Sequence, residues 1–308
     1  MNSPDIAKPL RGIIPPMVTP LLDRNTLDAE GLEKLIEHIL AGGVHGLFIL
    51  GSTGEAPSLS YELRYELIER VCRRVNSRVP ILVGITDTSF VESVKIAQYS
   101  HEQGVSAVVL APPYYFSSGQ PELLEYLGHL TAEVPLPIFL YNMPEYTKVN
   151  IEPDTVVKAA DNPKIIGLKD SSGDMEYFHK LQMFFKDRPG FSLLVGPEEL
   201  LAEAVLLGGH GGICGGANIF PRLYVELYDA AVAGNLEMVR RLHEKVMGIS
   251  VTIYSTGSFR SSILKGIKCS LGLMGICSDF IAEPFHRFRQ PEKKRIKEYL
   301  EQLKVGLK

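Results

Sequence analysis

The chain has 308 residues, of which 45% are hydrophobic and 22% are charged, a composition typical of a globular protein with a large core. Its net charge of −4 offers no basic excess for a nucleic-acid backbone and no polybasic stripe for a membrane surface. Because no apolar leader opens the chain and no run approaches the ~18 apolar residues of a membrane span, we expect a cytoplasmic protein without nucleic-acid or membrane partners.

Eight short apolar segments predict buried strands, and they alternate with amphipathic stretches of helical period such as Asp28–Leu40 and Tyr61–Val75. The starts of these segments recur every 20 to 34 residues, which is the length of one βα unit. In chain order, the predicted strands are Gly12–Pro20, Gly46–Ser52, Pro80–Thr86, Ala107–Pro113, Pro137–Pro144, Ile165–Ser171, Phe191–Gly196 and Gly211–Asn218.

Eight βα units favour a closed (β/α)8 barrel of the α/β class. An open, doubly wound sheet is the alternative, but the turn after the first predicted strand is Met17-Val18-Thr19-Pro20 and has no GxGxxG pattern. After residue 218 only helical periods follow, over Leu236–Tyr254, Phe259–Leu273 and Glu292–Leu303. We therefore expect a catalytic barrel in residues 1–234 and a helical extension, packed on it, in residues 235–308.

The cysteines and histidines do not form a recognisable metal or nucleophile motif. Four scattered cysteines make no CxxC pair, and we expect them to be reduced core thiols. HExxH, paired histidines at helical spacing, a strand-end carboxylate cluster and GxSxG do not occur. His45 and His210 lie in glycine-rich turns, where a hydrogen bond is sufficient to explain them. The sequence predicts neither a metal centre nor a Ser-His-Asp site.

In a barrel of this kind the active site is built at the C-terminal ends of the strands. Lys169 follows the apolar run 165–168, where a buried ammonium is costly unless it is paired or deprotonated. A lysine in such a place can be a nucleophile near neutral pH. Pairing with Asp170, or extension of the amine to solvent, is the alternative.

Three further strand ends carry groups that suit the same chemistry. Tyr141 ends the run 138–140, and its phenol can move protons at the barrel mouth or simply make one hydrogen bond there. The turn Gly51-Ser52-Thr53-Gly54-Glu55 offers two hydroxyls and backbone N–H groups, including that of Gly54, which can hold a carboxylate. The alternative is that this turn only connects the strand to the next helix and caps it. Tyr114-Tyr115 follows the run 108–113 and is either catalytic or a packing or subunit-contact pair.

Together these segments resemble the dihydrodipicolinate synthase / N-acetylneuraminate lyase family of Schiff-base lyases. The resemblance runs from Gly12 to about Asn218 and rests on five motifs in order: GSTGE at 51–55, PPYY at 112–115, YNMP at 141–144, IIGLKDSSG at 165–173 and GGHGGICGGAN at 208–218. It implies that Lys169 forms an imine with pyruvate and that Tyr141 is the proton shuttle.

The resemblance assigns further roles. It implies that Ser52 and Thr53 hold the pyruvate carboxylate and connect the proton relay, and that Tyr115 completes this relay across a subunit contact. It also implies that Ile213 places its backbone carbonyl near the bound keto acid. A protonated imine is an electron sink that serves C–C cleavage, C–C formation or loss of water, so no metal or organic cofactor is required. A homotetramer built from two dimers is the family's usual assembly.

The chain also departs from the family pattern. Tyr146 stands where the lysine-pathway synthases carry an arginine that grips the carboxylate of the aldehyde, and tyrosine offers one hydrogen bond without a cationic fork. Tyr61 and Arg64 match the lysine-feedback site poorly, so inhibition by lysine is not expected. The stretch Thr256–Lys265 departs both from these synthases and from the sialic acid lyases.

Three functions stay open on the sequence. The preferred one is aldol cleavage, condensation or dehydration of another 2-oxo acid, such as a 2-keto-3-deoxy sugar acid, with pyruvate and an aldehyde as the small-molecule partners. The second is 4-hydroxy-tetrahydrodipicolinate synthase activity, which condenses pyruvate with aspartate semialdehyde. The third is a barrel that binds a keto acid without catalysis, although Lys169, Tyr141 and both hydroxyl residues are present.

Overall fold

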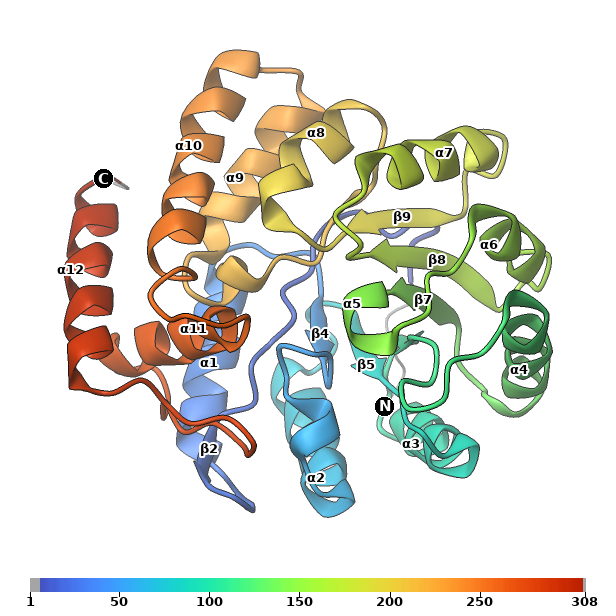
Figure 1. The fold of residues 1–308 in the computed structure, drawn as a ribbon, viewed down its shortest axis with the longest axis horizontal. Coiled ribbons are helices and arrows are strands. Elements are labelled where there is room, and N and C mark those ends of the chain that lie inside the picture. Colours follow the sequence, from blue (N-terminus) through green and yellow to red (C-terminus); the bar gives the residue numbers. More distant parts are fainter. Residues whose placement is uncertain (1–5, 307–308) are drawn as a thin grey trace.

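Eight parallel strands form one sheet in the order β1-β10-β9-β8-β7-β6-β5-β4 (Figure 1) in the computed structural model, which describes residues 6–306. The ring closes because the Met17 N–H donates to the Phe48 carbonyl at 2.8 Å and the Phe48 N–H donates to the Pro15 carbonyl at 3.0 Å. The predicted (β/α)8 barrel is therefore confirmed. Its strands are β1 Gly12–Ile13, β4 Leu47–Ile49, β5 Ile81–Gly84, β6 Ala107–Leu110, β7 Ile138–Asn142, β8 Ile165–Asp170, β9 Ser192–Val195 and β10 Gly211–Gly212.

Helices follow the strands and surround the sheet (Figure 1). Asp28, Ser60, Ser89 and Asp174 cap four of them by accepting a hydrogen bond from a first-turn N–H. The surrounding helices are α1 Ala29–Ala41, α2 Tyr61–Val75, α3 Phe90–Glu102, α4 Gln120–Glu133, α6 Pro153–Ala159, α7 Met175–Phe185, α8 Leu201–Leu206 and α9 Pro221–Val232. A short helix, α5 Pro144–Thr147, lies between β7 and α6.

Three helices follow the last βα unit: α10 Leu236–Thr252, α11 Ser261–Leu273 and α12 Gln290–Gly306. They lie on one side of the barrel, where α10 packs against α9 and α12 is outermost (Figure 1). Among residues 6–306, no helix combines the length and apolar character needed to cross a lipid bilayer. The four cysteines are buried and unpaired, as predicted.

The barrel interior and the sheet-to-helix layer form two separate apolar clusters. The interior cluster includes Phe48, Phe139, Leu194, Ile213 and Tyr141, all less than 9% exposed. The larger cluster lies between the outer face of the strands and the helices. This division follows from the alternation of side chains along each strand. It places one polar residue, Tyr141, in the interior cluster at the end of β7.

The first and last strands of the barrel, β1 and β10, pair through two glycines. Gly12 pairs with Gly211, and both have positive φ values, +99° and +144°. A Cβ on Gly211 would lie 2.0 Å from the carbonyl oxygen of Gly12. No other residue type allows this approach, because only glycine lacks the Cβ and adopts such φ values readily. The glycine-dense stretch 208–212 is thus a closure element of the fold.

The first and last predicted strands are much shorter than expected. Of Gly12–Pro20, only Gly12–Ile13 is a strand, because Pro15 and Pro16 lack the N–H group that a continuous ladder needs. Of Gly211–Asn218, only Gly211–Gly212 is a strand, and the segment then turns into a 3-10 helix, η3 Gly215–Asn218. A small antiparallel hairpin, β2 Leu21–Asp23 with β3 Thr26–Leu27, was not predicted.

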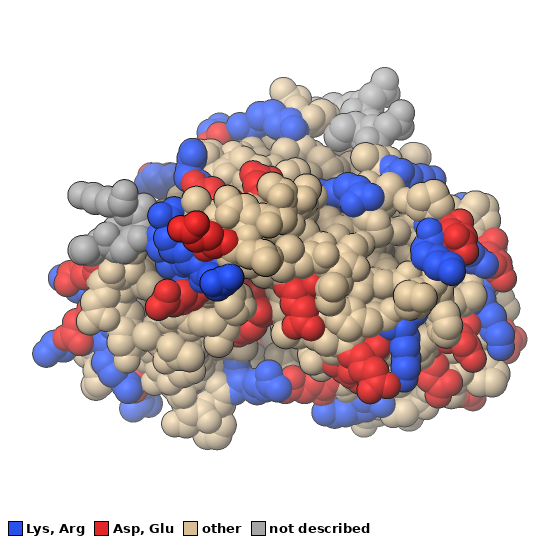
Figure 2. Space-filling view, turned by 90° about the horizontal axis from the view of Figure 1, so that it is seen from above, with Lys and Arg blue, Asp and Glu red and all other residues tan. Residues whose placement is uncertain are grey.

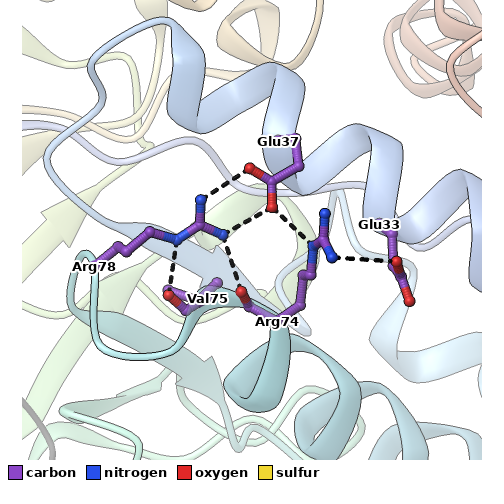
Figure 3. A network of polar contacts seen from close by, with 5 residues as sticks. All are labelled: Glu33, Glu37, Arg74, Val75 and Arg78. Atoms are coloured by element: carbon purple, nitrogen blue, oxygen red, sulfur yellow. Dashed lines mark hydrogen bonds and ion pairs between the residues drawn. The ribbon is translucent and has the colours of Figure 1, made fainter.

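Acidic and basic side chains intermingle on the face shown in Figure 2, where neither sign forms a continuous stripe. One ion-pair network joins α1 to α2 (Figure 3). In it, the Glu37 carboxylate accepts hydrogen bonds from Arg74 Nε at 2.8 Å and from both terminal amines of Arg78 at 2.8 Å. Hydrogen bonding from Arg78 is the largest of the effects that lower the pKa of Glu37 to about 2.

We expect Glu37→Gln to lower the free energy of unfolding at pH 7 by about 1 kcal/mol or less, because the network is exposed to solvent. The folded carboxyl titrates near 2 and the unfolded one near 4.5, so its contribution is present above pH 4.5 and disappears as the pH falls towards 2. Urea unfolding of both proteins across this range measures the difference. A difference that stays constant down to the lowest pH would contradict this account.

Candidate active site

Lys169 and Tyr141 meet inside the mouth of the barrel. They are register partners on β8 and β7. The Lys169 Nζ lies 4.1 Å from the centroid of the Tyr141 ring and 5.2 Å from that of Phe48. Both side chains are buried, at 5% and 6% exposure. The amine and the phenol therefore share one largely water-excluded space at the C-terminal end of the strands.

Lys169 is not neutralised by its neighbour in sequence. Asp170 accepts hydrogen bonds from Asn142 Nδ2 and the Ser172 hydroxyl, both at 3.0 Å, on the opposite face of β8. Within residues 6–306 the Lys169 amine forms no ion pair, and it does not extend to solvent. The geometry thus excludes both alternatives for the Lys169 amine, namely pairing with Asp170 and extension to solvent.

The Tyr141 hydroxyl has polar neighbours that favour proton transfer. Its oxygen is 3.5 Å from the Ser52 hydroxyl at the end of β4. Burial raises the pKa of Tyr141, but the Lys169 charge and hydrogen bonding to Ser52 and Ser171 outweigh burial, and the net result is a lowered pKa. A phenol that ionises more easily beside an amine can accept and return its protons.

The turn after β4 lies between two unusual backbone conformations. Leu50 and Glu55, which flank Gly51–Gly54, both adopt left-handed backbone conformations, with φ of 57° and 59°. Such conformations in non-glycine residues cluster at functional sites. Ser52 and Thr53 are partly exposed and cap no helix, since Ser60 caps α2. The expectation that this turn is only a helix-capping connection is therefore not met, and its role in holding a carboxylate stays a prediction.

A buried ion pair holds this turn in place. The Glu55 carboxylate pairs with the Lys268 amine from α11, and both side chains are at most 3% exposed. Glu55 also accepts the Ala282 N–H at 2.8 Å, and Lys268 donates to the Phe280 carbonyl at 2.7 Å. The C-terminal helices are thus linked directly to the turn that carries Ser52 and Thr53.

Behind β10 lies a fully buried carboxyl that the sequence analysis did not identify. Glu198 follows β9 and accepts hydrogen bonds from the Gly216 N–H and the Tyr254 hydroxyl, both at 2.8 Å, and from the Tyr224 hydroxyl. Burial is the dominant effect and raises its pKa to about 7. The cluster fixes the segment after Ile213, whose side chain is 1% exposed in the barrel interior.

Two of the predicted site residues stand apart from this group in the single chain. Tyr115 is 79% exposed, and its ring contacts Phe116, which is 81% exposed. Tyr146 is 50% exposed on α5. The structure therefore gathers Lys169, Tyr141, Ser52, Thr53, Gly54 and Ile213 at one end of the barrel, and leaves Tyr115 at the surface and Tyr146 at the rim.

The remaining candidates have internal partners. The His45 and His210 rings accept the backbone N–H groups of Ile13 and Leu193, as the sequence analysis expected, and burial lowers the pKa of His210 to about 4. Arg64 forms a buried ion pair with Asp87 at 3.0 Å, and Asp87 also accepts the Tyr61 hydroxyl. The Tyr61 and Arg64 side chains thus both bind the Asp87 carboxylate.

Comparison with known proteins places this geometry in a family. Residues 9–303 match the model of the dihydrodipicolinate synthetase family. The chain belongs to this family. A 4-hydroxy-tetrahydrodipicolinate synthase of Thermodesulfovibrio yellowstonii is 32% identical over 290 residues, which cover 94% of this chain and 97% of that protein.

Two solved structures of the family are also similar. A dihydrodipicolinate synthase from Bacteroides thetaiotaomicron is 58% identical with a TM-score of 0.94, covering 96% of this chain and 100% of that one. YagE, a prophage protein of E. coli K12 described in complex with pyruvate, is 30% identical with a TM-score of 0.90, covering 96% and 99%. The chain is thus a lyase of the dihydrodipicolinate synthetase family, whose members include a protein that binds pyruvate.

Lys268→Met tests the link between the C-terminal helices and the turn. Removing the amine leaves the Glu55 carboxylate buried without its cation, so we expect a loss of about 3–5 kcal/mol in the free energy of unfolding. The double variant Glu55→Gln/Lys268→Met should recover part of this loss in denaturant unfolding. The control Lys34→Met removes an exposed ion pair with Glu30. Equal losses in Lys268→Met and the control would disprove the role.

Glu198→Gln tests the buried carboxyl through the pH dependence of stability. The folded group titrates near 7 and the unfolded one near 4.5, so between these values only the unfolded chain gives up the proton, and rising pH favours unfolding. The variant lacks this titration. Its melting temperature relative to the unmodified protein should therefore rise between about pH 4.5 and 7.5.

The neighbouring Glu199→Gln is the matched control for this measurement, because Glu199 is only partly buried and accepts the Ser250 hydroxyl at 2.6 Å. A difference between Glu198→Gln and the unmodified protein that does not change with pH would refute the assignment.

Proposed function

We propose that this chain forms an imine between Lys169 and pyruvate and condenses it with aspartate semialdehyde, the activity named for its 4-hydroxy-tetrahydrodipicolinate synthase relatives. The observation that carries the proposal is the position of the buried Lys169 amine, 4.1 Å from the Tyr141 ring centroid and without an ion-pair partner among residues 6–306. The relatives' names favour this activity over the sugar-acid chemistry that the sequence analysis preferred.

The proposed reaction begins at the carbonyl carbon of pyruvate. The neutral Lys169 amine attacks this carbon, and loss of water leaves a protonated imine. The Tyr141 phenol delivers the proton that the leaving water requires and exchanges it with the Ser52 hydroxyl, 3.5 Å away. Ser52, Thr53 and the Gly54 backbone N–H hold the pyruvate carboxylate, and the Ile213 carbonyl faces the keto acid.

The imine then makes the methyl carbon of pyruvate a nucleophile. Loss of a proton from this carbon gives an enamine, which attacks the aldehyde carbon and forms the new C–C bond. The amino group of aspartate semialdehyde next attacks the imine carbon, closes the ring and releases Lys169. We assign these proton transfers to the Tyr141 hydroxyl, and the scheme uses no metal or organic cofactor.

A second candidate is cleavage of a 2-keto-3-deoxy sugar acid to pyruvate and an aldehyde. Tyr146 favours it, because this half-exposed phenol on α5 suits a neutral hydroxylated aldehyde better than a carboxylate.

We further propose a cytoplasmic homotetramer in which the exposed Tyr115 completes the proton relay of a neighbouring chain. The division into a barrel of residues 1–234 and an extension of residues 235–308 is likewise a proposal.

Borohydride reduction in the presence of pyruvate tests the imine. The unmodified protein should gain the mass of one reduced pyruvate on Lys169, identified by peptide mass spectrometry. Lys169→Ala should gain none, whereas the control Lys148→Ala, which removes an exposed lysine directly after α5, should be labelled fully. Labelling of Lys169→Ala, or no labelling of the unmodified protein, would disprove the imine.

Steady-state assays test the substrate. The unmodified protein should condense pyruvate with aspartate semialdehyde far faster than with glyceraldehyde, and Tyr141→Phe should lower kcat by about 10²- to 10⁴-fold because a positioned proton donor is lost. Faster turnover with glyceraldehyde, or pyruvate release from 2-keto-3-deoxy acids, would establish the second candidate instead.

A further inference from the structure

The proposed function requires a group that recognises the carboxylate of the aldehyde. Three of the buried cations are already committed. Lys169 becomes the imine nitrogen, while Lys268 and Arg64 pair with Glu55 and Asp87. We therefore expect the partner of a second carboxylate among the remaining cations at the rim of the barrel.

Arg260 brings a cation from the C-terminal helices to the rim of the barrel. It lies at the end of the loop between α10 and α11, and its Nε is 2.9 Å from Glu145 Oε1 on α5. The guanidinium is 72% exposed. Among residues 6–306, Glu145 is the only ion-pair partner of this guanidinium. The N–H groups that do not face Glu145 are exposed and can donate to an oxyanion.

The platform that holds Arg260 is fixed to the catalytic strands. Helix α5 directly follows β7, which ends one residue after Tyr141 (Figure 1). Asn142 is fully buried and bonds both the Asp170 carboxylate at 3.0 Å and the Asn150 amide oxygen at 2.9 Å. These bonds fasten the loop that contains α5 at both ends. Glu145 therefore presents the guanidinium from a position set by β7 and β8.

Tyr146, the neighbour of Glu145, connects the arginine electrostatically with the catalytic phenol. Burial raises the pKa of Tyr146, the charges of Glu145 and Tyr141 raise it further, and the Arg260 charge lowers it. The Tyr146 hydroxyl is thus within electrostatic range of both Tyr141 and Arg260.

We propose that Arg260 is the residue that selects a carboxylate-bearing aldehyde, by donating hydrogen bonds to this carboxylate from its exposed guanidinium N–H groups. The inference rests on the proposed function and names the residue that supplies its substrate recognition. Guanidinium and carboxylate form two parallel charge-assisted hydrogen bonds, a geometry that a lysine or tyrosine cannot reproduce. A neutral aldehyde lacks the carboxylate and gains nothing from this contact, so Arg260 increases the selectivity for carboxylate-bearing aldehydes over neutral ones.

Steady-state kinetics with pyruvate and aspartate semialdehyde test the proposal. Arg260→Ala should raise the KM for aspartate semialdehyde by about 10- to 100-fold, the range expected for lost hydrogen bonds to a charged group. The KM for pyruvate and the borohydride labelling of Lys169 should not change. Arg260→Lys should fall between Arg260→Ala and the unmodified protein, because it keeps the charge but loses the fork.

Two further variants separate recognition from a structural role. Glu145→Gln removes the charge of the ion pair but keeps a side-chain oxygen that can accept from Arg260 Nε, so it should raise the KM for aspartate semialdehyde far less than Arg260→Ala does. Arg188→Ala removes a similar exposed pair, with Asp161 at 2.9 Å, before β9 at the opposite end of the barrel. It should behave as the unmodified protein does.

The outcomes distinguish the two proposals. If Arg260→Ala and Glu145→Gln raise the KM alike, Arg260 only braces α5 and the inference is wrong. If the unmodified protein condenses aspartate semialdehyde and Arg260→Ala does so with the same KM, the inference alone fails. If the unmodified protein does not condense this aldehyde, the proposed function and the inference fail together.

Discussion

The pairing of β7 with β8 sets the geometry of the candidate site, because it places the Lys169 amine against the Tyr141 ring. A strand position in a barrel offers little freedom, since a shift of one residue would turn each side chain to the other face. Asp170 demonstrates this constraint. It lies next to Lys169 in the chain, yet it faces the outer layer and bonds Asn142 there, and the amine inside the barrel has no counterion among residues 6–306.

Long-range polar contacts hold the loops around this pair. The buried Glu55–Lys268 ion pair joins the turn after β4 to α11. The Glu198 cluster joins the segment after β9, the segment after β10, helix α9 and the residues just after α10. Burial of such charges is costly unless they are paired and hydrogen-bonded, so each contact defines one arrangement of its loop. The C-terminal helices are therefore part of the framework that shapes the site.

The same helices bear on the proposed function. In that proposal the imine chemistry rests on Lys169 and Tyr141, and the second substrate is recognised at the rim, where α5 and the loop before α11 come together through Glu145 and Arg260. Loops at the rim of such a barrel can vary while the strands stay the same. Tyr146 alone would suit a neutral aldehyde, and the proposed role of Arg260 supplies the cation that a carboxylate requires.

The order and spacing of apolar runs determined the barrel and the positions of Lys169, Tyr141, Ser52 and Thr53, because parallel βα units bring all strand ends to one face. Local patterns could not show how the termini of the barrel close, since prolines and glycines there replace regular strands. Contacts between segments far apart in the chain, namely Glu55 with Lys268, Glu198 with its tyrosines and Glu145 with Arg260, leave no periodic trace. Only the tertiary structure decided them, because their partners meet through packing of separate helices and loops.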